Sequence, residues 1–140
     1  MDYEQTVRVK ADPARTWQAL AAVTTYPQWT TSMTAVTPLD DSALVPGNRF
    51  RITQPRMPVL VWRVSEVHEG SDYQWEARSP GVLTVASHEL AADPEGGTIL
   101  TLRVRQAGPL AGLVRLLTGA RTRRYMALEA AGLKAAAEAA

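Results

Sequence analysis

The feature that most constrains this chain is a series of strand-like segments joined only by short turns. Residues 48–106 alternate apolar and polar side chains through most of their length, which is the pattern of strands with one buried face. Consecutive strands with short connections must be antiparallel, because a parallel pair requires a crossover of a dozen or more residues. An antiparallel sheet with one apolar face in turn needs another element to cover it.

The same alternation and the turn residues between segments place the expected elements. We expect strands at residues 3–10, 34–39, 48–54, 59–68, 73–78, 82–92 and 98–106. Two short helices are expected after the first strand, at residues 14–23, where Asp12 and Pro13 form a start signal, and at residues 28–33. After Gly108-Pro109 the chain is rich in Ala, Leu and Arg and predicts a helix of about thirty residues, roughly 45 Å long. Gly119 is a candidate position for a bend in this helix.

Together these elements predict a single α+β domain over residues 1–140. A curved antiparallel sheet of about seven strands would wrap around the long C-terminal helix, the only element large enough to cover it. A helix that lies in a curled sheet leaves space at one end, and small-molecule sites are common in such hollows. We therefore expect an internal pocket for a small hydrophobic molecule between the sheet and this helix.

Composition argues against several classes of function. The formal net charge of +1 is too small to make nucleic acid or an anionic membrane the main partner. The chain has no cysteine, and because P-loop, dinucleotide-binding and zinc-ligand spacings are absent, we expect neither a cofactor nor a metal. The N-terminus is polar, and the longest apolar stretch, residues 107–117, is interrupted by Arg115. We therefore expect a cytoplasmic monomer or homodimer without integral membrane association.

Side chains on the expected inner faces are the candidate ligand contacts. Aromatic residues there provide large apolar area and stacking surfaces for a ring-bearing ligand. For any single one of them, simple core packing is the alternative interpretation. The expected pocket residues are Phe50, Ile52, Gln54, Trp62, Tyr73, Trp75, His88, Leu100, Leu102, Leu113, Leu117, Arg121, Arg124, Tyr125 and Leu128.

His88 is the candidate catalytic residue. By strand alternation it shares a face with Ala86 and Leu90, and a histidine in an apolar pocket can act as a general base or a hydrogen-bond donor. The alternative is a wall histidine satisfied by one hydrogen bond. On the long helix, either Arg121 or Arg124 is expected near the sheet, depending on where the apolar face is centred. An arginine that extends to solvent at the helix edge is the alternative there.

Several short motifs spread along the whole chain point to a family. They are Ala11-Asp12-Pro13, Trp17, Tyr26-Pro27-Gln28-Trp29, Pro46-Gly47-Asn48-Arg49-Phe50, Trp62-Arg63-Val64, Trp75-Glu76-Ala77-Arg78-Ser79-Pro80-Gly81, His88-Glu89-Leu90, Gly96-Gly97-Thr98 and Arg123-Arg124-Tyr125. With these motifs the chain resembles the START-like, or Bet v 1-like (SRPBCC), superfamily, and within it the bacterial polyketide cyclase/dehydrase group. The resemblance implies a helix-grip fold. It does not determine the activity, because this superfamily binds lipids, polyketides, hormones, quinones and partner proteins.

Three functions are compatible with these residues. The first is binding of a lipid, polyketide or aromatic metabolite in the internal pocket. The second is a polyketide aromatase/cyclase-like or dehydratase-like activity in which His88 or the inward arginine polarises a carbonyl group. The third is a protein–protein interaction module. Binding is favoured, because the expected inner face carries few polar side chains for a catalyst.

Overall fold

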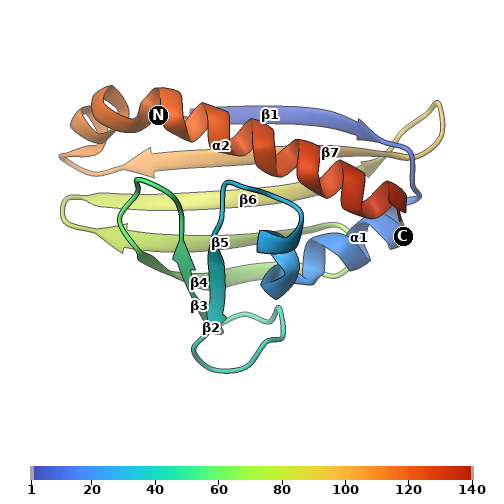
Figure 1. Ribbon diagram of the computed structural model, residues 1–140, viewed down its shortest axis with the longest axis horizontal. Helices are drawn as coiled ribbons and strands as arrows, with labels where there is room; N and C mark the ends of the chain where they lie inside the picture. Colours follow the sequence, from blue (N-terminus) through green and yellow to red (C-terminus); the bar gives the residue numbers. More distant parts are fainter. Residues whose placement is uncertain (1, 140) are drawn as a thin grey trace.

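The computed structural model describes residues 2–139 and combines one sheet with a long helix and shorter helical segments (Figure 1). In chain order the elements are β1 (Asp2–Val9), α1 (Pro13–Ala21), the 3-10 helix η1 (Val23–Gln28), β2 (Ala35–Pro38), β3 (Arg49–Thr53), β4 (Leu60–His68), β5 (Asp72–Ser79), β6 (Val82–Ala92), β7 (Thr98–Ala107) and α2 (Ala111–Ala139). Each expected strand is present, and its ends move by at most one residue. The α+β class and the helix-grip arrangement are confirmed.

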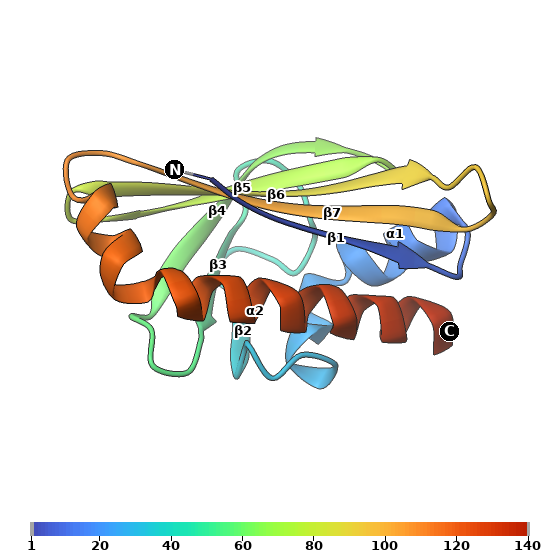
Figure 2. The same cartoon turned by 90° about the horizontal axis from the view of Figure 1, so that it is seen from above.

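The strands form one antiparallel sheet in the order β1-β7-β6-β5-β4-β3-β2. Successive strands from β2 to β7 are neighbours, as the short turns require. Strand β1 pairs with β7 along its whole length, from Asp2 opposite Arg105 to Val9 opposite Thr98. Figure 2 shows α2 running along one face of the sheet, with β2 and β3 curling toward the helix. This curl gives the sheet the concave face that holds the pocket.

Helix α1 begins at the predicted start signal. The Asp12 Oδ1 atom accepts a hydrogen bond from the Arg15 backbone N at 2.8 Å, and Pro13 occupies the first turn. Because an unpaired N–H at a helix start is unfavourable, this cap fixes where the helix begins. The buried face of α1 then places Trp17 and Leu20 in the core.

The second short helix differs from the expectation. Residues 28–33 were expected to be helical, but η1 contains Pro27 and ends at Gln28, where the expected helix would begin. Beyond it Thr30 and Ser32 are buried, and their hydroxyl groups hydrogen-bond to each other at 2.7 Å. Short polar side chains that bond locally compete with helical backbone bonds, which is why this segment forms turns instead.

Helix α2 is the longest element, with 29 residues. Figure 2 shows its first turns set at an angle to the rest of the helix. Within residues 2–139, no helix carries a stretch long and apolar enough to cross a membrane.

The two halves of α2 pack differently against the sheet. Its second half contributes the fully buried Ala130, Leu133 and Ala137, and these small or branched side chains allow a close approach. This half also packs closely on the segment after η1, because a Cβ atom added at Gly132 would lie 2.2 Å from the Trp29 backbone oxygen. The first half contributes few buried residues. The core is therefore filled at one end of the helix and open at the other.

Candidate ligand-binding pocket

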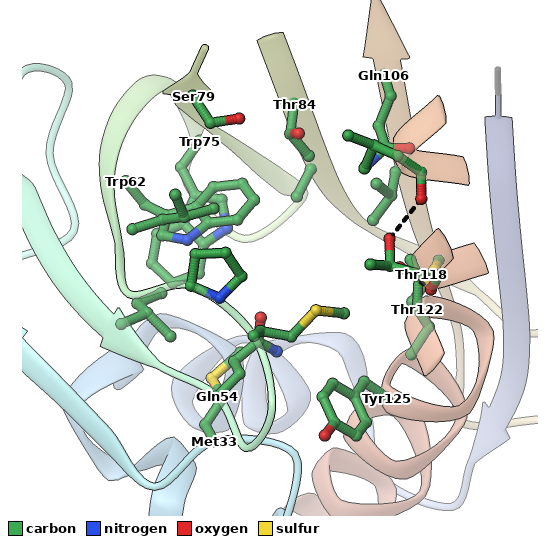
Figure 3. A pocket seen from close by; sticks show the side chains of 18 of the residues that line it. Met33, Gln54, Trp62, Trp75, Ser79, Thr84, Gln106, Thr118, Thr122 and Tyr125 are labelled. Atoms are coloured by element: carbon green, nitrogen blue, oxygen red, sulfur yellow. Dashed lines mark hydrogen bonds between the residues drawn. The ribbon is translucent and has the colours of Figure 1, made fainter. Parts of the chain in front are cut away.

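A cavity of about 240 Å³ lies between the sheet and α2 (Figure 3). Its apolar wall consists of Met33, Ile52, Met57, Pro58, Leu60, Trp62, Trp75, Val82, Ala86, Val104, Val114 and Met126. The polar residues that line it are Gln54, Ser79, Thr84, His88, Gln106, Thr118, Thr122, Tyr125 and Glu129. A mainly apolar lining with a few polar groups is typical of small-molecule sites.

Strand β6 supplies one wall of the cavity through its alternation. Val82, Thr84, Ala86 and His88 are buried and line the cavity, because alternate side chains of a strand point to the same face. The strand pairs with β5 on one side and β7 on the other. His88 is therefore held by a central strand of the sheet and not by a loop.

The buried polar pair of the pocket consists of His88 and Glu129. His88 is 2% exposed, and its Nε2 atom lies 3.6 Å from the Oε1 atom of Glu129 on α2. Among residues 2–139, neither the Nδ1 atom of His88 nor the Oε1 atom of Glu129 has a hydrogen-bond partner. A buried polar atom left without a partner is destabilising by about 1–3 kcal/mol. A ligand group that forms a hydrogen bond with one of these atoms would therefore relieve this penalty and bind favourably.

Aromatic rings fix the position of the His88 imidazole. It stacks on the Tyr73 ring with the centroids 4.1 Å apart and the planes inclined by 7°. The Trp75 ring meets it edge-on, with the centroids 5.7 Å apart. Such contacts restrict rotation of the side chain. The imidazole thus keeps one edge toward Glu129.

A chain of buried hydroxyl groups lies behind this stack. The Tyr26 hydroxyl donates to the Leu20 carbonyl oxygen at 2.6 Å and lies 2.7 Å from the Tyr73 hydroxyl. Because the single Tyr26 proton is used on Leu20, the Tyr73 hydroxyl is the donor to Tyr26. Burial, and then the negative charge of Glu129, raise the pKa of Tyr26 well above its ordinary value. Burial is likewise the main reason that the pKa of Tyr73 is raised.

The loop between β3 and β4 borders the cavity and is bonded to α2. The Tyr125 hydroxyl donates to the Pro55 carbonyl oxygen, and the Arg121 Nη1 atom donates to the Arg56 carbonyl oxygen at 2.8 Å. Gln54 and Met57 of the same loop line the cavity. These two hydrogen bonds join the loop to the helix beside the pocket. Within the part of the chain that the structure describes, no group of three or more His, Cys, Asp or Glu side chains could hold a metal ion.

A family model described as polyketide cyclase / dehydrase and lipid transport matches residues 1–138. The chain belongs to this family. Membership supports a fold that binds hydrophobic ligands. No curated protein matches the chain.

Solved structures share the fold at low sequence identity. The Zhui aromatase/cyclase from a Streptomyces species superposes with a TM-score of 0.81 at 16% identity, covering 99% of this chain and 93% of that chain. The structure of Ara h 8.0201 gives 0.73 at 12% identity, covering 100% and 99%. A protein from Thermus thermophilus gives 0.78 at 13% identity, covering 99% and 98%. These likenesses show that this member of the polyketide cyclase family shares the fold of those structures.

The sequence-predicted pocket residues of this family member fall into three groups. Those that line the cavity are Ile52, Gln54, Trp62, Trp75, His88 and Tyr125. Those that are buried without lining it are Phe50, Tyr73, Leu100 and Leu102. Those that do not line it and are half-buried or exposed are Leu113, Leu117, Arg121, Arg124 and Leu128. Contact of the first group with a ligand stays a prediction.

The expected inner face of α2 needs a correction at its first turns. Leu113 and Leu117 are 51% and 70% exposed, whereas Val114 and Thr118, one residue later, line the cavity. The prediction assumed that the most apolar residues would face the sheet. In the structure the first turns of α2 are separated from the sheet by the cavity. The leucines would find no packed core on that side.

The two candidate arginines of α2 both lie outside the cavity lining. Neither Arg121 nor Arg124 lines the cavity. Arg121 is half-buried and uses its guanidinium group on the β3–β4 loop, and Arg124 is exposed. The aliphatic stem of an arginine can pack while its charged end stays in water, which is the alternative considered for these residues.

The predicted pocket set lacked six of the polar residues that line the cavity, namely Ser79, Thr84, Gln106, Thr118, Thr122 and Glu129, and Glu129 is the acidic one among them. Its signal is a polar stripe on α2 formed by Thr118, Thr122, Tyr125 and Glu129, with the spacing of three or four residues that marks one helix face. The prediction instead assigned Leu113 and Leu117, which precede the stripe, and Leu128, which lies within it, to the inner face. Only contact with His88 distinguishes Glu129 from an exposed carboxylate on a helix surface.

Proposed function

We propose that the protein binds a small, neutral, largely apolar molecule that carries one hydrogen-bonding group. The observation that carries this proposal is a cavity with aromatic and aliphatic walls that also contains the buried His88–Glu129 pair. Burial of apolar surface supplies about 25 cal/mol per Å² toward affinity before the costs of association. The polar pair then favours ligands with a hydroxyl or carbonyl group.

The cavity volume limits the size of this molecule. An apolar cavity of about 150 Å³ is large enough for benzene, and this one measures about 240 Å³. Drug-sized ligands use pockets of roughly 300–1,000 Å³. A compound of one or two rings, or a short chain, therefore fits the described cavity.

The charges around the cavity argue for a neutral ligand. Glu129 is the acidic residue that lines it, and no Lys or Arg does so among residues 2–139. An anionic ligand would therefore face a carboxylate without a compensating cation, and burying an unpaired charge is unfavourable. A neutral phenol or ketone avoids this penalty and still bonds to His88.

Naphthol, a two-ring phenol, is a suitable probe for this proposal. We expect it to quench tryptophan fluorescence, because Trp62 and Trp75 line the cavity. Thr122→Trp, which places a ring in the cavity, should weaken binding about tenfold or more. Ala127→Trp on the exposed side of α2 is the matched control and should bind like the wild type.

Native mass spectrometry of the freshly purified protein adds an independent readout, since a tightly bound apolar compound is retained. The proposal fails if naphthol and lipophilic metabolites neither bind nor alter the melting temperature, or if Thr122→Trp binds as well as Ala127→Trp. In that case a protein–protein interaction module becomes the better explanation of the fold.

Acid–base catalysis is the second candidate function, and the His88–Glu129 distance of 3.6 Å favours it. A carboxylate beside an imidazole stabilises the imidazolium that forms when histidine accepts a proton. In such a reaction the His88 imidazole would remove a proton from the carbon between two carbonyl groups, with Glu129 beside the ring. The resulting enolate would then be available for ring closure.

Benzoylacetone in deuterated water tests this second function. A catalyst should accelerate exchange of the carbon-bound protons between its carbonyl groups, as followed by NMR. His88→Phe keeps an aromatic ring against Tyr73 but removes the base, so exchange should fall to the uncatalysed rate while binding persists. Exchange that is unchanged in this variant would leave ligand binding as the function.

A further inference from the structure

Residues 110–117, at the start of α2, expose more large apolar side chains than any other segment among residues 2–139. The exposed fractions are 43% for Leu110, 51% for Leu113, 81% for Leu116 and 70% for Leu117. Single exposed leucines are common on protein surfaces, but a contiguous group indicates an interaction site. We call these four residues the leucine tip.

The leucine tip lies within the most basic part of the chain. No Asp or Glu occurs in residues 96–128, whereas Arg115 lies among the leucines and Arg121, Arg123 and Arg124 follow them on α2. None of these four arginines forms an ion pair within the described residues. The net charge of +1 conceals this separation, because the carboxylates lie elsewhere in the chain.

The spacing of leucines and arginines suits a boundary between an apolar layer and an anionic layer. Leu116 precedes Arg123, and Leu117 precedes Arg124, by seven residues, so these arginines lie about two helical turns beyond the leucines. Seven residues correspond to roughly 10 Å along a helix. An interfacial helix buries its apolar side chains about 5–10 Å deep, at the boundary between headgroups and acyl chains.

The same turns border the cavity on their inner side. Val114 and Thr118 line the cavity, while Leu113 and Leu117 beside them face outward. The Leu110 backbone N also bonds to the Gly81 carbonyl oxygen at 3.0 Å, which holds this end of the helix against the β5–β6 turn. A surface that contacts the leucine tip would therefore lie next to the pocket.

We infer that the leucine tip and its arginines dock on an anionic lipid surface. The leucines enter the apolar layer, and the exposed Arg123 and Arg124 bind lipid headgroups. A second copy of this chain fits less well, because a symmetric contact would bring like-charged arginines together. This docking does not depend on which molecule occupies the cavity.

Vesicle flotation tests the inference with two lipid compositions. The protein should float with vesicles of equal parts phosphatidylcholine and phosphatidylglycerol, and should not float with phosphatidylcholine alone. The double variant Leu116→Ser/Leu117→Ser should reduce partitioning about tenfold or more, since burial of each leucine contributes strongly. Arg124→Glu should weaken partitioning, and high salt should weaken it in the wild type.

Matched substitutions control for composition and charge. Val45→Ser in the β2–β3 loop removes an exposed apolar side chain, and Arg51→Glu in β3 makes the same charge change as Arg124→Glu; both should float like the wild type. The inference is overturned if the wild-type protein does not float with anionic vesicles, or if the double variant floats as well as the wild type. The inference also fails if the wild type does not bind vesicles but sediments as a dimer, and if the double variant sediments as a monomer.

Discussion

Tyr26 shows how one buried residue links an early loop to the pocket. It lies in η1, yet its ring packs on Trp29 with centroids 4.6 Å apart and its hydroxyl reaches Tyr73 in β5. Tyr73 in turn carries the His88 imidazole. The hydrogen bond between the two buried hydroxyl groups holds the rings of Tyr26 and Tyr73 in place, because a buried hydroxyl left unpaired is unfavourable. The His88 ring stacked on Tyr73 is held with them. The pocket histidine is therefore positioned by residues that no ligand needs to touch.

This hydroxyl chain predicts a stability loss at high pH. Burial raises the pKa of Tyr26 and Tyr73 above the ordinary value of 10.0, so the folded state retains protons that the unfolded state releases. The contribution of these two groups to the free energy of unfolding is fully present below the ordinary pKa. It declines as the pH rises above that value, by at most about 1.4 kcal/mol per pH unit for each group. Urea unfolding at a series of alkaline pH values measures the slope. Tyr26→Phe/Tyr73→Phe should flatten it, and equal slopes would contradict the assignment.

Helix α2 is one element with two roles. Its second half places Ala130, Leu133 and Ala137 in the core, and its first half borders a cavity with Val114 and Thr118. Helix stability in proteins comes mainly from tertiary packing. The second half therefore anchors the element, whereas the first half is free to present one face to a ligand and the other outward.

A pair of glycine substitutions tests this division. Gly132→Ala would place a Cβ atom 2.2 Å from the Trp29 backbone oxygen, whereas Gly112→Ala meets nothing within 4 Å. We expect the first change to lower the free energy of unfolding by about 1–3 kcal/mol through overpacking. The second should raise it by about 0.4–1 kcal/mol, because alanine restricts the unfolded chain. Chemical denaturation measures both, and equal effects would argue against tight packing at Gly132.

At the scale of the whole molecule, the cavity couples ligand binding to folding. The pocket exists only when strands β3 to β7 and α2 are assembled, since each contributes lining residues. A ligand of this pocket therefore binds the folded state and not the unfolded chain. Binding of that kind stabilises the whole fold by mass action.

Calorimetry can measure this coupling. Naphthol at a hundred times its dissociation constant should raise the free energy of unfolding by about 2.7 kcal/mol. For a domain of this size the melting temperature should then increase by roughly 5 °C or more. Thr122→Trp should lose the increase, while Ala127→Trp should keep it. An equal increase in both variants would locate the ligand outside the cavity.

The sequence by itself determined the strands, the antiparallel pairing of consecutive strands joined by short turns and the long terminal helix, because alternation and short turns are local and leave few alternatives. It also assigned His88 to the inner face of the sheet, since strand alternation specifies which face a residue occupies. Only the tertiary structure decided the rotation of α2, the pairing of His88 with Glu129 and the exposure of Leu116 and Leu117. The physical reason is that an apolar helix face is normally drawn to a core, and here the first turns face a hollow. Whether a core or a cavity lies opposite a helix depends on distant strands, and no local pattern records it.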